Sequence, residues 1–154
     1  MSEENSANFD VQETWTDAAS RPTIDPSVLA MDHVFDVLDH PRRRYVLYAL
    51  SNSEGCTLRE LARNIVAWER DSHETDVDEQ ARDRVYLSLY HAHIPKLVEE
   101  GVVEFEESEE TLQPGPHAEQ VFAVLESAGG ATDSDQQSHA ERGCAEASID
   151  EEIK

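Results

Sequence analysis

Apolar residues recur with helical spacing over most of residues 31–125, and the longest such pattern lies between Arg82 and Phe105. Apolar side chains return there every third or fourth residue, which predicts a helix with one buried face. This stripe comprises Val85, Tyr86, Leu89, Tyr90, His93, Ile94 and Leu97. Gly101 predicts the end of the helix, because glycine adopts the left-handed conformation of a helix terminus at little cost. The helix is expected to begin near Asp78 and to bend at Pro95, which has no N–H to donate.

A short β-hairpin is predicted directly after this helix. Residues 102–105 are branched, acidic or aromatic, which favours a strand, and residues 111–113 form the return strand. The acidic segment EESEE at 106–110 lies between them as the tip. A helix that leads through a glycine into a two-stranded hairpin is typical of the recognition helix and wing of a winged helix. The alternative is another α+β domain with a helix–glycine–strand corner.

Three helices are predicted before the long helix. The first, Met31–Leu38, has Val34, Phe35 and Leu38 on one face. Pro41 suits the first position of the second helix. That helix continues to Leu50, with Tyr45, Val46, Ala49 and Leu50 turned inward.

The third helix begins at Thr57, which is expected to cap it. Glu60, three residues later, completes a capping box. Its apolar stripe comprises Leu58, Leu61, Ala62, Ile65 and Val66. A polar loop at 69–77 separates it from the long helix, and an amphipathic helix at 117–125 ends the pattern. That last helix either packs on the core or pairs with a second copy.

These elements predict a mainly α fold with a small β-hairpin. We expect a winged helix-turn-helix domain at 31–126, with about five helices and a two-stranded wing. Residues 1–30 and 127–154 are polar and acidic, with few large apolar side chains, which predicts a disordered arm and a disordered tail.

The net charge of -22 changes what the surface can be expected to bind. The acidic residues are spread through every segment, and the chain has only two lysines, Lys96 and Lys154. This pattern is typical of proteins from salt-accumulating archaea, and it indicates more about the solvent than about a partner. The alternative is a specific acidic surface for a partner, which usually forms one block.

The two cysteines and the hydropathy pattern predict a cytoplasmic protein. Cys56 and Cys144 are far apart and form neither a disulfide framework nor a metal-binding motif, so a reducing compartment is expected. No apolar stretch is long enough to cross a membrane, and residues 1–10 lack the pattern of a secretory signal.

Three segments resemble a haloarchaeal winged-helix domain family that is catalogued as a domain of unknown function. They are HPRRRYVLYAL (40–50), TLRELARNIVAWE (57–69) and RDRVYLSLYHAHIPKLVEEGVVEF (82–105). The resemblance covers roughly residues 31–125, and the long loop after the AWE motif also belongs to the family pattern. It implies a winged helix and transcriptional regulation, and it supplies neither a reaction nor a ligand.

The candidate DNA-binding residues lie on two helices. If the domain binds DNA, the outer face of the long helix enters the major groove, and Arg84, Ser88 and His91 lie on that face. Arg42 and Arg43 are candidates for phosphate contacts beside it. The alternatives are a solvated helix face for the first group and internal ion pairs for the arginines. His93 lies on the buried stripe and is expected to be a hydrogen-bonded core residue.

A second function fits the same fold. The wing tip carries Glu106, Glu107, Glu109 and Glu110, which would repel phosphate, so the domain is alternatively a protein-interaction module without DNA binding. Its partner would contact the wing and residues 117–125. A regulator of this kind is expected to be a homodimer, joined through 117–125 or through the Met31–Leu38 helix.

The sequence contains none of the motifs that are typical of catalysis or cofactor binding. The sequence has neither a glycine-rich phosphate loop nor a nucleophile elbow nor an HExxH motif. His91 and His93 point about 200° apart on a helix and cannot share a metal ion. We therefore expect no enzyme, no cofactor and no metal site.

Overall fold

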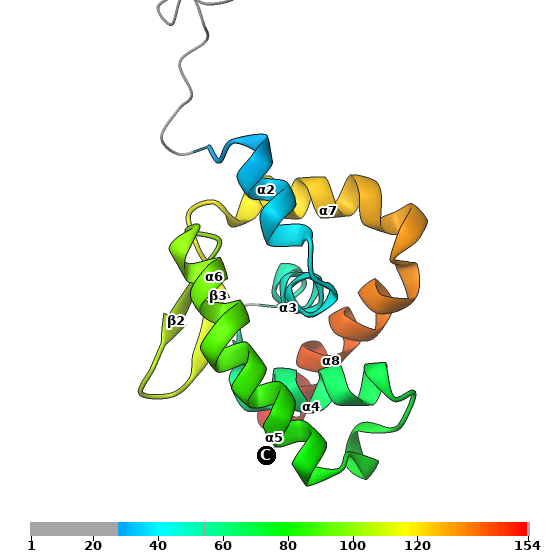
Figure 1. The fold of residues 1–154 in the computed structure, drawn as a ribbon. Coiled ribbons are helices and arrows are strands. Elements are labelled where there is room, and N and C mark those ends of the chain that lie inside the picture. The colour runs from blue at the N-terminus through cyan, green and yellow to red at the C-terminus, as the bar shows by residue number, and fades with distance from the viewer. Residues whose placement is uncertain (1–27, 54, 154) are drawn as a thin grey trace, which may run out of the picture.

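The computed structural model describes residues 28–53 and 55–153, and helices dominate it (Figure 1). The expected disordered arm at 1–30 lies outside the described residues except for its last three. In chain order the elements are α2 (Met31–Leu38), α3 (Pro41–Ser51), β1 (Cys56–Thr57), α4 (Leu58–Glu69), the 3₁₀ turn η2 (Glu74–Asp76), α5 (Glu79–Ser88), the π-turn η3 (Leu89–His93), α6 (Ile94–Glu99), β2 (Val103–Glu106), β3 (Thr111–Pro114), α7 (Ala118–Thr132) and α8 (Ser134–Ile153). This order, with its small sheet, is compatible with a winged helix.

Helix α3 is the centre of the core. Its residues from Tyr45 to Leu50 are all buried. They include Tyr45, Val46, Ala49 and Leu50, which the sequence pattern predicted to face inward. Figure 1 shows α3 end-on, with α2, α7, α8 and α4 arranged around it. A helix that is covered on several sides needs apolar residues around most of its circumference, so Leu47 and Tyr48 are buried as well.

The sheet has one strand more than the sequence indicated. Its order is β1-β3-β2, and all pairs are antiparallel. The predicted β-hairpin is confirmed as β2 and β3, with Phe105 opposite Leu112. The added strand β1 has only two residues, Cys56 and Thr57, too few for a recognisable alternation.

Two predicted helix boundaries are confirmed by their capping geometry. The hydroxyl of Thr57 accepts a hydrogen bond from the backbone N–H of Glu60, and the Glu60 carboxylate accepts one from the Thr57 N–H. Gly101 has a φ of 73°, so it takes the left-handed conformation after α6. A β-carbon added at Gly101 would lie 2.8 Å from Nδ1 of His117. Glycine is therefore required there for both backbone and space.

The expected burial of α2 was partly wrong. Val34 is buried as expected, but Phe35 is 56 % exposed and Val37 is buried in its place. Asp36, on this helix, pairs with Lys96 of α6. Burial of Val34 and Val37 sets the rotation of α2 about its axis, and this rotation leaves Phe35 on the solvent side.

The structure also differs from the expected disordered tail at 127–154. Helix α7 extends to Thr132, and α8 packs against α3 and α4, where Ala140 and Cys144 are buried. The close approach of α8 to α4 depends on small side chains, since a β-carbon added at Gly143 would lie 2.5 Å from Nδ2 of Asn64. The same Gly, Ala and Ser content suggested disorder from the sequence, because composition alone does not show which surface a small-residue face will contact.

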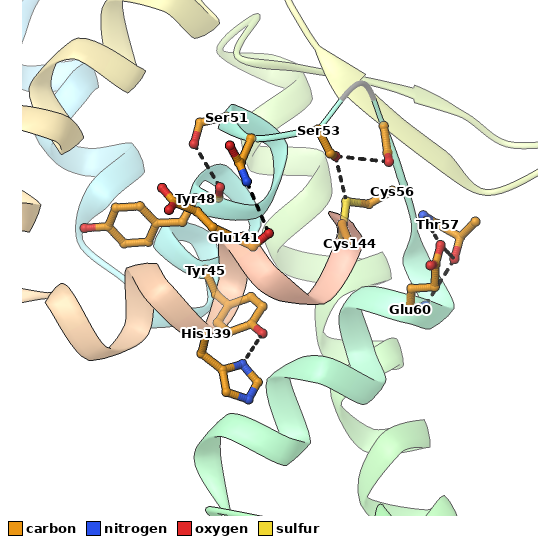
Figure 2. Close-up of a disulfide and its surroundings, with 12 residues drawn as sticks. Tyr45, Tyr48, Ser51, Ser53, Cys56, Thr57, Glu60, His139, Glu141 and Cys144 are labelled. Atoms are coloured by element: carbon orange, nitrogen blue, oxygen red, sulfur yellow. Dashed lines mark hydrogen bonds between the residues drawn. A yellow bond between two sulfur atoms is a disulfide. The ribbon is translucent and has the colours of Figure 1, made fainter. Parts of the chain in front are cut away.

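The expectation of unpaired cysteines was wrong. Cys56 and Cys144 form a disulfide that joins β1 to α8, with 6.0 Å between their Cα atoms (Figure 2). Around it, Ser53 Oγ lies 3.5 Å from the sulfur of Cys56. The Tyr45 hydroxyl lies 2.6 Å from Nδ1 of His139 on α8. The disulfide and these contacts hold the C-terminal helix on the core.

Candidate nucleic-acid interface

The long predicted helix is continuous in sequence but changes its hydrogen-bond pattern in the middle. Between α5 and α6, η3 forms one π-turn, in which the N–H of Ile94 donates to the carbonyl of Leu89, five residues earlier. Pro95, the second residue of α6, cannot donate to the carbonyl of His91. A π-turn rotates the residues after it relative to those before it. Residues on the two sides of η3 therefore do not keep the spacing of a single α-helical face.

This π-turn separates the three candidates on the long helix. Arg84 is exposed and Ser88 is half-buried on α5, before the turn, while His91 is exposed within it. The His91 ring lies edge-on to Tyr90, with their centroids 5.2 Å apart. His91 also lines a cavity with Glu106 and Glu107 of the wing.

Arg42 forms an internal ion pair, the alternative that the sequence left open for the basic cluster. Its Nε and Nη2 donate to the two carboxylate oxygens of Glu69, at 2.7 and 2.9 Å. This contact joins the start of α3 to the end of α4, and both side chains are about a quarter to a third exposed. The bidentate geometry occupies the face of the guanidinium that would otherwise bind a phosphate.

Arg43 has a structural role. It donates to the carbonyls of Val37 and Asp36, each at 2.8 Å, and so satisfies the end of α2. Its Nη1 lies 3.3 Å from Nδ1 of His93, a residue of η3 that is 6 % exposed. His93 is thus the hydrogen-bonded core histidine that the sequence predicted, and it holds Arg43 against the buried side of η3.

The protonation state of His93 supports this contact. Burial, together with the nearby His40 and Arg43, lowers the pKa of His93 to about 4. The imidazole is therefore neutral near pH 7, and its Nδ1 accepts the hydrogen bond from Arg43, because arginine can only donate.

Arg44, the third arginine of the basic cluster, also bonds to groups inside the domain. It pairs with Asp133 between α7 and α8 at 2.8 Å and also donates to the carbonyl of Leu38. The Tyr48 hydroxyl donates to the same Asp133 carboxylate. All three consecutive arginines are thus bonded inside the domain.

The exposed basic residues lie elsewhere, on α4 and α5. The exposed positions of α4 are Arg59, Arg63 and Glu69, so the two arginines lie one helical turn apart on its outer side. Arg59 lies over the Tyr86 ring of α5, 5.7 Å from its centroid. Arg82 is half-buried, lies 3.4 Å from the carboxylate of Asp83, and lines the same small cavity as Arg59, Asp83 and Tyr86. We call Arg59, Arg63 and Arg82 the α4–α5 basic surface.

This surface was missed by sequence reasoning although a signal was present. Arg59 and Arg63 occupy the polar positions of an amphipathic pattern at a spacing of four. Of the ion pairs among described residues, several involve Arg42, Arg44 and Lys96, but none involves Arg59, Arg63 or Arg84. The densest basic run in sequence is therefore bonded internally, whereas Arg59, Arg63 and Arg84 remain exposed.

The wing presents carboxylates at its tip. Glu106, Glu107 and Glu109 are exposed, while the Glu110 carboxylate accepts a hydrogen bond from the Tyr86 hydroxyl. Ser108 donates to Glu106 from its backbone and its hydroxyl, which lowers the pKa of that carboxyl. Glu106 thus stays ionised, and the wing tip is unsuited to contact with phosphate.

The described part of the chain has neither a helix that is long and apolar enough to cross a membrane nor a group of three metal-ligating side chains. A comparison with curated proteins gives no match, and neither does a comparison with solved structures. The family model for a domain of unknown function, DUF7344, matches residues 35–113. The match runs from Phe35 in α2 to Gln113 in β3, so it includes residues of all three strands. The chain therefore belongs to the DUF7344 family.

Proposed function

We propose that this protein is a DNA-binding transcriptional regulator that crosses the duplex with α4 and presents α5 to the major groove. In helix-turn-helix proteins the first helix crosses the backbone and the second enters the groove. The order α4, α5 and wing agrees with that arrangement. The observation that carries the proposal is the α4–α5 basic surface, where the exposed Arg59 and Arg63 lie with the half-buried Arg82 in a chain of net charge -22.

The proposed contacts differ in part from those expected from the sequence. Arg59 and Arg63 contact phosphates, and Arg84, Ser88 and His91 remain the candidates for base edges. Arg42 and Arg43 hold the domain together, because their guanidinium groups are bonded to Glu69 and to the end of α2.

The acidic surface makes the salt concentration part of the proposal. At about 1 M salt the Debye length falls to about 3 Å, so the wing carboxylates repel the backbone only at close range. We propose that the protein binds DNA at molar KCl, as expected for a halophilic cytoplasm.

The test is chromatin immunoprecipitation with sequencing of the tagged protein in its native host. We expect sharp peaks that share a short motif for the wild type and for the control Arg142→Ala, which removes an exposed arginine of α8. The double variant Arg59→Ala, Arg63→Ala should lose those peaks while remaining folded. A flat profile for folded wild-type protein would refute DNA binding and favour the protein-interaction module, for which the acidic wing is the supporting observation.

We also propose that the regulator is a homodimer through α2. Met31 and Phe35 are 55 % and 56 % exposed and lie one turn apart on this helix. The other candidate, residues 117–125, places Ala118, Val121 and Leu125 in the core, so that face is occupied. Light scattering at molar KCl tests the proposal, since Phe35→Ser should give a monomer and Leu87→Ser, at another exposed apolar residue, should not.

A further inference from the structure

A second surface, distinct from the α4–α5 basic surface, lies between α6 and the wing. A cavity of about 710 Å³ is bounded by Phe105 of β2 and by the helical residues Tyr90, His91, Ile94, Pro95 and Val98, with Glu106 and Glu107 at its rim. Figure 1 shows α6 beside the sheet, whereas α5 leads away toward α4. We call this cavity the α6–wing groove.

The floor of the groove is apolar and rigidly supported. The Tyr90 ring meets Phe105 edge-on at 6.1 Å and stacks on Tyr86 at the same centroid distance. The Tyr86 hydroxyl is in turn bonded to Glu110 at the end of the wing. An aromatic row that is fixed at both ends needs little reordering when an apolar side chain enters beside it.

The groove is also open to solvent. Val98 is 43 % exposed although it lies beside buried Leu97 and near buried Ile94. Strand β2 lies at the edge of the sheet, because the strand order is β1-β3-β2. Backbone groups at a sheet edge are able to pair with an added segment.

The negative charge of Glu106 and Glu107 determines which kind of partner the groove can bind. The carboxylates at the rim repel the phosphates of DNA. They also repel α2 of a second copy, because its exposed apolar residues Met31 and Phe35 lie beside Asp32 and Asp36. Lysine and arginine would instead be attracted to Glu106 and Glu107.

We propose that the α6–wing groove binds a partner protein through a segment whose large apolar side chains are flanked by lysine or arginine. The apolar side chains pack between Val98 and Phe105, and the basic residues pair with Glu106 and Glu107. The groove contains neither Arg59 nor Arg63, so it does not require the α4–α5 basic surface, although it shares His91 with the proposed base contacts.

Site-specific photo-crosslinking in the native host tests this proposal. Benzoylphenylalanine replaces Val98 in the groove or, as the matched control, Leu87, which is 52 % exposed but does not line the groove. We expect a crosslink to another protein from position 98 only, and mass spectrometry should place it in an apolar segment flanked by basic residues. A crosslink to a second copy or to DNA, or no crosslink at all, would overturn the proposal.

Binding of the purified partner provides the second measurement. Val98→Asp and the double variant Glu106→Lys, Glu107→Lys should each weaken the affinity by about tenfold or more, as expected for residues at the centre and rim of a contact. Leu87→Asp should change it by less than about twofold. Equal affinity for all variants would refute the assignment of the groove, whereas the loss of DNA binding in Arg59 and Arg63 variants would leave it unaffected.

Discussion

The sulfur atoms of Cys56 and Cys144 are bonded to each other across 88 residues of sequence. Cys56 begins the sheet inside the region that the family model matches, and Cys144 lies on α8 outside it. The bond therefore attaches α8, which packs on α3 and α4, covalently to the family domain.

Removal of this bond should destabilise the protein. Cys144→Ser should lower the free energy of unfolding by about 2–4 kcal/mol, because the unfolded chain regains the entropy that a long closed loop removes. Urea denaturation followed by circular dichroism measures the change. Reductant should shift the wild type toward the variant and leave the variant itself unchanged, and equal stability in both states would contradict this role.

Arg43→Ala should destabilise the domain without removing a DNA contact. The substitution leaves the carbonyls of Val37 and Asp36 and Nδ1 of His93 without their donor. We expect a loss of about 2–4 kcal/mol, since hydrogen bonds to charged groups contribute about 1.5–3 kcal/mol each and are not additive. Arg84→Ala, at an exposed position, is the control and should stay within about 0.5 kcal/mol.

His93 should make stability depend on pH. Its pKa is lowered from 6.5 to about 4 in the folded state, so between these values the unfolded chain binds a proton that the folded chain does not. Stability is therefore unaffected above about pH 6.5 and falls as the pH is lowered toward 4, by a total on the order of 3 kcal/mol.

Denaturation midpoints between pH 7 and pH 4 measure this effect. His93→Gln, which does not titrate, should lose that part of the dependence. His33 contributes with the opposite sign, because its hydrogen bond to Glu100 raises its pKa and stabilises the fold at low pH. His33→Gln should therefore steepen the loss of stability on acidification, and an unchanged slope in His93→Gln would contradict the assignment.

Gly101→Ala tests the corner between α6 and the wing. A β-carbon there meets both a φ of 73° and the Nδ1 atom of His117, which itself lies 2.8 Å from the Glu100 carbonyl. We expect a loss of at least about 1–2 kcal/mol, which is the cost of the left-handed conformation for a residue with a β-carbon. Glu99→Ala, at an exposed position of α6, should have little effect in the same thermal denaturation.

Local patterns of the sequence determined most of the elements of this fold. The capping box at Thr57, the glycine at 101 and the apolar stripe from Val85 to Leu97 each act within a few residues, so their consequences were predictable. The buried, hydrogen-bonded state of His93 followed from the same stripe.

Tertiary structure alone decided which polar residues are free and what covers the core. Arg42 and Arg43 resemble DNA contacts in sequence. In the structure Arg42 binds Glu69, which is 27 residues away, and Arg43 binds carbonyl groups at the end of α2. The cysteine pair and the packing of α8 depend on segments about 90 residues apart. Periodicity describes one helix at a time, whereas ion pairs, small-residue contacts and disulfides depend on how separate helices meet.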